Sequence, residues 1–161
     1  MENIVGGLIG GIHLVTAVLA MLFGSLVLFM AKGTRKHKQV GYLYVVSMLI
    51  MLVTSFMLYR LFRGFGIFHI ASIFSALTLF GGMYPVIARK PDTNWIGHHF
   101  AFMYWSVVGL YAAFFSEVLT RVPETPFFWM VGVASGLTFI VGGFVFSKKK
   151  HEWYALYAKN A

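Results

Sequence analysis

The chain has 161 residues, of which 59% are hydrophobic and 11% are charged, whereas about 25% of an average soluble domain is charged. This composition predicts an integral membrane protein and argues against a soluble enzyme. The chain has no cysteine, which excludes disulfides, iron–sulfur clusters, thiolate-bound zinc and thioether-attached haem. The net charge of +8 would suit a nucleic-acid partner, but the placement of the charges favours a topological explanation.

Five apolar stretches are long enough to cross a bilayer as helices, and none alternates in polarity as the short strands of a membrane barrel do. They cover residues 4–31, 40–60, 65–88, 99–119 and 127–147. The connections are too short to hold a folded extramembrane domain. We therefore predict one all-α domain over residues 1–147, an antiparallel bundle of five transmembrane helices, followed by a basic and aromatic tail over residues 148–161. We expect the first stretch to be retained, because its apolar run is longer than the core of a signal peptide.

Most of the basic residues outside the apolar stretches fall on one predicted side of the membrane. By the positive-inside rule they place the N-terminus outside and the C-terminus in the cytoplasm, which predicts a multi-pass protein of the cytoplasmic membrane and no nucleic-acid partner. The tail could also touch anionic lipid, although its charges have this simpler topological explanation. Ten basic residues fall on the predicted inner side and three, named last, on the outer side: Lys32, Arg35, Lys36, Lys38, Arg89, Lys90, Lys148, Lys149, Lys150 and Lys159, against Arg60, Arg63 and Arg121.

Three ionisable residues, His13, His69 and Glu117, lie within different apolar stretches. Along the chain, each is separated by 19 or 20 residues from a basic residue or histidine at the predicted inner face. This separation corresponds to roughly 28 to 30 Å of helix. They are therefore expected at one depth near the outer face, with Met57 or Tyr59 close by. Two neutral imidazoles and a carboxylate suit a Zn, Fe or Mn ion, and ionisable groups within spans are functional candidates.

The alternative interpretation of these three residues is structural. Each histidine would form a hydrogen bond across a helix contact, and Glu117 would pair with Arg121 one turn away. The first and third stretches support either interpretation, because each carries a stripe suited to close helix packing. The stripe on the first stretch comprises Gly6, Gly10, His13, Ala17, Ala20 and Gly24, and that on the third comprises Gly66, His69, Ser72, Ala76 and Met83.

A second cluster is expected at the inner face, where His37 begins the second stretch and His98 and His99 begin the fourth. His99 and Glu117 are 18 residues apart, or five helical turns, and therefore share one face of the fourth stretch. If His13 pairs with His69, and His37 with His99, the four histidines form the layout of a two-haem b-type electron carrier. A third interpretation is a non-enzymatic membrane partner or transporter subunit.

The segment His37 to Val45, HKQVGYLYV, together with HFAFM at His99 to Met103 and Arg121, resembles a family of bacterial predicted membrane proteins of unknown function. The resemblance covers roughly residues 10–122 and implies a multi-pass bacterial membrane protein without supplying a reaction. It carries over His37, Gly41, His99 and Met103 as motif positions. The chain departs from the family pattern after His99, where it has Phe100, Ala101 and Phe102. Beyond the lipid bilayer, the expected partners are a second copy of the chain and a lipophilic substrate or quinone, and the sequence leaves open whether the protein is an enzyme.

Overall fold

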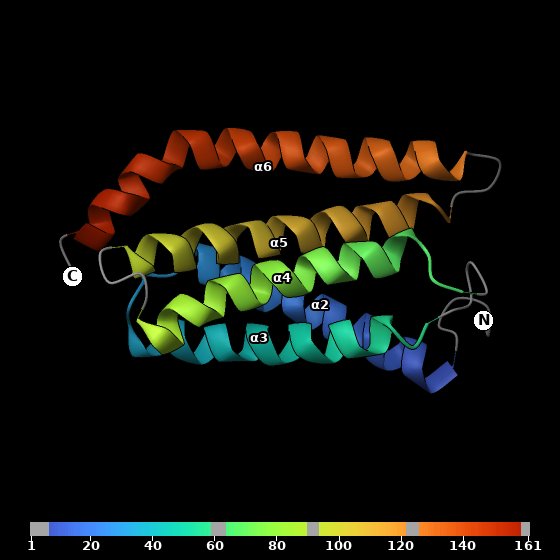
Figure 1. Ribbon diagram of the computed structural model, residues 1–161, viewed down its shortest axis with the longest axis horizontal. Coiled ribbons are helices and arrows are strands. Elements are labelled where there is room, and N and C mark those ends of the chain that lie inside the picture. The colour runs from blue at the N-terminus through green and yellow to red at the C-terminus, as the bar shows by residue number, and fades with distance from the viewer. Residues whose placement is uncertain (1–6, 59–63, 90–93, 122–125, 159–161) are drawn as a thin grey trace. The chain divides into compact units, whose positions relative to one another are not determined.

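A computed structural model of the chain describes residues 7–58, 64–89, 94–121 and 126–158 (Figure 1). Within these ranges every regular element is a helix, and five helices are long and apolar enough to cross a membrane. This confirms the all-α fold and the number of predicted spans. The helices are α2 (Gly7–Phe29), α3 (Arg35–Ser55), α4 (Ile67–Ala88), α5 (Trp95–Leu119) and α6 (Phe127–Ala158).

Several helix boundaries differ from the prediction by a few residues, and two of the differences have identifiable reasons. α3 begins at Arg35 rather than at residue 40, because the Thr34 hydroxyl accepts a hydrogen bond from the backbone N–H of His37 and caps the helix within the basic segment. α6 does not end at residue 147 but continues to Ala158, through lysine, glutamate and alanine residues that favour helix. Four of the basic residues counted above lie outside the described residues: Arg60, Arg63, Lys90 and Lys159.

The chain divides into two compact units, Met1–Leu77 and Thr78–Ala161, and the boundary lies within α4. In the first unit α2 packs against α3. The predicted small-residue stripe of α2 is the packed face, where Ala17, Ala20 and Gly24 are buried; Gly6 lies outside the described residues. α3 contributes the buried Tyr44 and Met48 to the core of this unit.

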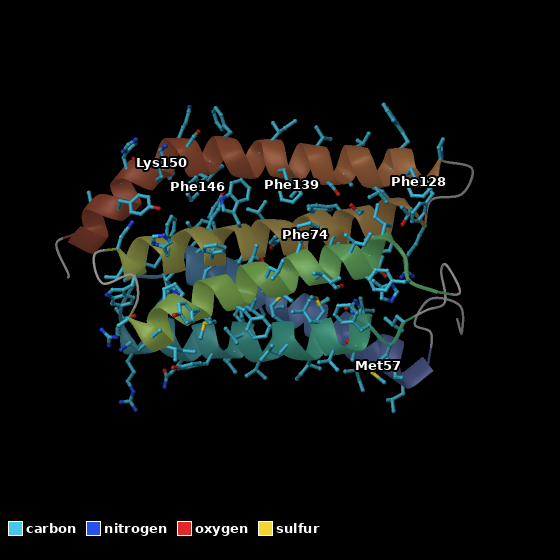
Figure 2. All side chains as sticks on the ribbon, viewed as in Figure 1. Met57, Phe74, Phe128, Phe139, Phe146 and Lys150 are labelled. Atoms are coloured by element: carbon cyan, nitrogen blue, oxygen red, sulfur yellow. The ribbon has the colours of Figure 1, made fainter. Side chains whose placement is uncertain are left out.

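In the second unit α5 packs against α6, and the two helices run side by side in Figure 1. α5 is the most enclosed of the five candidate spans: 44% of the residues in its apolar 18-residue segment are buried, compared with 11% for α6. Its core is aromatic: Phe100, Tyr104 and Trp105 all lie within ring contact of Phe146 on α6, which Figure 2 labels. Farther along the same seam, Gly142 lets α6 approach Val108 closely.

Candidate functional site

The side chain of His13 joins α2 to the end of α3. Its Nδ1 lies 3.1 Å from the carbonyl oxygen of Met51 and 3.1 Å from the hydroxyl of Thr54. A carbonyl oxygen can only accept, so Nδ1 carries the proton and donates it. In the neutral ring the lone pair then lies on Nε2, the atom able to take up a proton or bind a metal. Histidine ligands of metals are usually oriented in this way, with the other ring N–H held by a backbone carbonyl or a carboxylate.

The final turn of α3 also reaches α4. The Ser55 hydroxyl donates to the Ser72 hydroxyl at 2.8 Å, and Ser72 in turn donates to the carbonyl of Phe68. Two adjacent residues, Thr54 and Ser55, therefore contact His13 of α2 on one side and α4 on the other. Thr54 was not predicted as a site residue, and its signal in the sequence is a hydroxyl beside Ser55 near the end of an apolar stretch.

His69 lies in the first turn of α4 and is 4% exposed. Its Nδ1 accepts a hydrogen bond of 3.1 Å from the backbone N–H of Gly66, the residue before the helix. A side chain three residues into a helix that accepts from the N-cap backbone N–H is half of a capping box, so His69 helps to start α4. The ring also stacks on Phe65, with centroids 5.0 Å apart, and its Nε2 is buried.

His13 and His69 therefore present opposite chemistry. The proton of neutral His13 lies on Nδ1, whereas that of neutral His69 lies on Nε2, because its Nδ1 is an acceptor. As the rings stand, Nε2 of His13 is a base and Nε2 of His69 is a donor. The sequence signal for the capping role is Gly-x-x-His at the start of an apolar run.

Glu117 lies near the end of α5, in the second unit, where its carboxylate forms an ion pair with Arg121 at 2.5 Å. The two side chains are one turn apart and partly exposed, at 42% and 52%. The pairing foreseen in the structural alternative is therefore present. Of the two residues expected at similar depth, Met57 is 52% exposed at the end of α3, where Figure 2 labels it, and Tyr59 lies outside the described residues.

His99 joins α5 to α4 within the second unit. Its Nδ1 lies 2.7 Å from the carbonyl oxygen of Gly82, so His99, like His13, donates through Nδ1 and carries its lone pair on Nε2 when neutral. The two helices are very close at this point. A Cβ atom on Gly82 would lie 2.6 Å from the sulfur of Met103, the motif residue one turn after His99.

The two other histidines of the predicted inner cluster have different surroundings. His37 is half-buried in the first turn of α3, in the first unit, with its backbone N–H on the Thr34 cap. His98 is exposed and its Nδ1 donates to the carbonyl of Asn94 at 2.8 Å, within its own helix. His37 belongs to the first unit and His99 to the second. His13 and His69 likewise belong to the first unit, whereas Glu117 belongs to the second.

In the described part of the chain, no group of three or more histidine, cysteine, aspartate or glutamate side chains is arranged to hold a metal ion. The structure assigns described contacts to each member of the predicted triad: His13 bonds to α3, His69 caps α4 and Glu117 pairs with Arg121. The ligand sets proposed from the sequence stay predictions.

Five apolar helices joined by short connections define a multi-pass membrane protein. The chain belongs to the family described as "Predicted membrane protein (DUF2306)", whose sequence model matches residues 10–149 and whose function is unknown. The match includes most of α6, which extends the expected resemblance beyond residue 122. No curated protein and no solved structure matches the chain.

Proposed function

We propose that this protein binds redox cofactors through histidines within its spans and carries electrons across the membrane, with b-type haem as the cofactor. In this proposal His13 supplies a ligand in the first unit and His99 supplies one in the second. The electron donor or acceptor would be a quinone or another lipophilic molecule, which reaches such sites from the bilayer.

The proposal rests on one observation: His13 and His99 are held in the same way. Each ring donates Nδ1–H to a backbone carbonyl of a neighbouring helix, which fixes the ring and places the lone pair on Nε2. A histidine that ligates haem iron is typically held in this way. An ionisable side chain within a span is also costly to keep, and the helix contacts could be made by an apolar residue.

The positions of these two histidines along their helices suit a carrier that spans the bilayer. His13 lies six residues after the first residue of α2, and His99 lies four residues after the first residue of α5. If each helix crosses once, α2 and α5 begin at opposite faces. With the N-terminus outside, as the basic residues suggest, His13 would lie near the outer face and His99 near the inner one in an antiparallel bundle.

The second ligands follow from the sequence pattern: His69 for the first site and His37 for the second. His69 could serve only if its proton moved to Nδ1, which would require the ring to release the Gly66 N–H. The cofactor would supply the change between ferric and ferrous iron, and the protein would orient the ligands and exclude water.

A single Zn, Fe or Mn ion held by His13, His69 and Glu117 has less support from the observed contacts. It would require Glu117 to leave Arg121 and His69 to change tautomer. In a third interpretation, a non-enzymatic membrane partner or transporter subunit, the same histidine contacts would serve packing alone.

The absorption spectrum of the detergent-purified protein, with elemental analysis of the same sample, tests the proposal. We expect a Soret band with bound iron and two haems per chain. Either His13→Ala or His99→Ala should remove about half of the absorbance. His98→Ala is a matched control, because it removes a neighbouring histidine that is exposed on the same helix.

The other outcomes are equally informative. Zinc, iron or manganese without porphyrin would replace the haem proposal with the single-metal site, and Glu117→Gln would then weaken metal retention. A colourless, metal-free protein from haem-producing cells would contradict both cofactor proposals. His37→Ala and His69→Ala would identify the remaining ligands.

A further inference from the structure

One end of the second unit carries a concentrated positive charge that the proposed cofactor sites do not use. We call this surface the basic rim; it comprises Arg89 at the end of α4 and Lys148, Lys149 and Lys150 on α6. Figure 2 labels Lys150 where α6 bends. Among the described residues of this end, Glu152 is the one acidic side chain, and it pairs with Lys149 at 2.9 Å. The rim therefore keeps a net positive charge.

The bent end of α6 is held against the beginning of α5. The Tyr154 hydroxyl lies 3.5 Å from the carbonyl oxygen of Gly97, and the Tyr154 ring meets Phe100 edge-on, with centroids 6.0 Å apart. Gly97 makes room for this contact, because a Cβ atom there would lie 2.7 Å from the Tyr154 ring. Figure 1 shows the same bend toward the start of α5. The tail is therefore docked on the beginning of α5.

The length of α6 is consistent with lysines at the depth of lipid headgroups. Lys148 follows the first residue of α6, Phe127, by 21 residues, which is about 32 Å of helix against a hydrocarbon core of about 30 Å. The apolar part of α6 thus ends where the lysines begin. Trp95, the first residue of α5, is of the type that anchors helices at this depth.

Two of the cations rest on aromatic rings. The guanidinium carbon of Arg89 lies 4.9 Å from the centre of the Trp95 ring, and Nζ of Lys148 lies 4.4 Å from the centre of the Phe144 ring. Ring contacts of this kind hold a cation without neutralising it. Both groups thus retain their full charge for an anion approaching from the membrane surface.

We propose that the basic rim binds the phosphate headgroup of an anionic phospholipid in the adjoining leaflet. Arg89 would donate to the phosphate oxygens through its planar fork, and the lysines would contribute point charges. The topological explanation of the lysines requires only their charge and their side of the membrane. The lipid site also requires the docked tail, so a variant that undocks the tail distinguishes the two.

Native mass spectrometry of the full chain, extracted from liposomes of phosphatidylcholine and phosphatidylglycerol, tests the site. We expect wild-type protein to retain phosphatidylglycerol in preference to phosphatidylcholine. A basic residue near an anionic surface contributes about fivefold in binding. In the triple variant K148Q/K149Q/K150Q, the preference for phosphatidylglycerol over phosphatidylcholine should therefore fall by about tenfold or more.

A matched triple variant, R35Q/K36Q/K38Q, removes the same charge from exposed residues of the first unit and should keep the preference. K148R/K149R/K150R retains the charge and should also keep it, which controls for folding. Tyr154→Ala leaves every rim charge in place but removes the docking contact, and it should lower retention. Equal retention of the two lipids by wild type, equal losses in the two glutamine variants, or unchanged retention in Tyr154→Ala would overturn the proposal.

Discussion

The seam between α2 and α3 and the seam between α5 and α6 hold their helices together by different means. At the first seam His13 bonds to Met51 and Thr54, and the adjacent Ser55 extends the polar contacts to α4. At the second, rings interlock around Phe146, and Gly142 allows close approach. A histidine provides the polar contact at the first seam, whereas the second combines aromatic packing with hydrogen bonds from Tyr104 and Ser116 and has no histidine among these contacts.

The difference bears on the proposed cofactor sites. In a bilayer there is no hydrophobic drive between helices, so close packing and interhelical hydrogen bonds must both supply association. Packing at Gly142 supplies it without a histidine or a charged side chain. The first seam retains His13 at a desolvation cost, and His99 forms a similar bond at the contact of α4 with α5. These two histidines are therefore the groups for which packing alone is the weakest explanation.

The largest effect should come from breaking the shape of the α5–α6 seam. In Gly142→Ala the new methyl group would lie 2.7 Å from Cγ1 of Val108, on two packed helices. Overpacking of this kind costs typically about 1 to 3 kcal/mol. Thermal unfolding in detergent should show the loss. Gly136→Ala is the control on the same helix, because a Cβ there has nothing within 4 Å, and it should be neutral or slightly stabilising. Equal losses at both sites would refute the packing explanation.

A smaller loss is expected from the main hydrogen bond of the same seam. The buried Tyr104 hydroxyl donates to the Gly142 carbonyl at 2.7 Å. Tyr104→Phe keeps the ring and removes this bond, and interhelical bonds in membrane proteins average about 0.6 kcal/mol with a maximum near 1.7. We expect about 1 kcal/mol in equilibrium unfolding, below the cost of Gly142→Ala. Tyr84→Phe, at a position that is 60% exposed, should change stability little. A cost for Tyr104→Phe above that for Gly142→Ala would make the second seam polar as well.

The fold followed from the sequence because runs of apolar residues identify spans without reference to contacts. The ends of helices did not follow as well, because Thr34 extends α3 into a basic segment through a single cap. The roles of the histidines were still less predictable. His13 and His69 both lie on small-residue stripes, yet one bonds across a seam and the other caps its own helix. These roles can be distinguished only if it is known which backbone group faces Nδ1. The spacing of residues in the sequence does not give this information.

A matched pair of serine contacts allows the two units to be compared directly. Ser55 and Ser72 are 2.8 Å apart in the first unit, and Ser116 and Ser135 are 3.0 Å apart between α5 and α6. Double-mutant cycles with alanine should give coupling energies of about 0.6 kcal/mol for each pair. If polar contacts hold the first unit and packing holds the second, the Ser55–Ser72 coupling should be the larger. The reverse order would contradict this assignment.

The smallest effect is expected at the end of the α2–α3 pair, where Lys32 follows α2. Its ammonium group donates to the carbonyls of Val27 and Leu28 in the last turn of α2, as cations at helix C-termini do. Burial lowers the pKa of Lys32 from 10.5 to about 8. Between these two pH values the folded protein has released a proton that the unfolded chain still binds. The free energy of unfolding should therefore rise with pH across this window.

Lys32→Gln removes the titrating group and should remove this dependence. Because Lys32 is only half-buried, solvent screening should limit the slope to roughly a few tenths of a kcal/mol per pH unit. The measurement is the thermal unfolding midpoint of both proteins in detergent from pH 7 to beyond pH 9. As the pH rises, the midpoint of the wild type should increase relative to that of the variant. Parallel curves would show that Lys32 keeps an ordinary pKa beyond the end of α2.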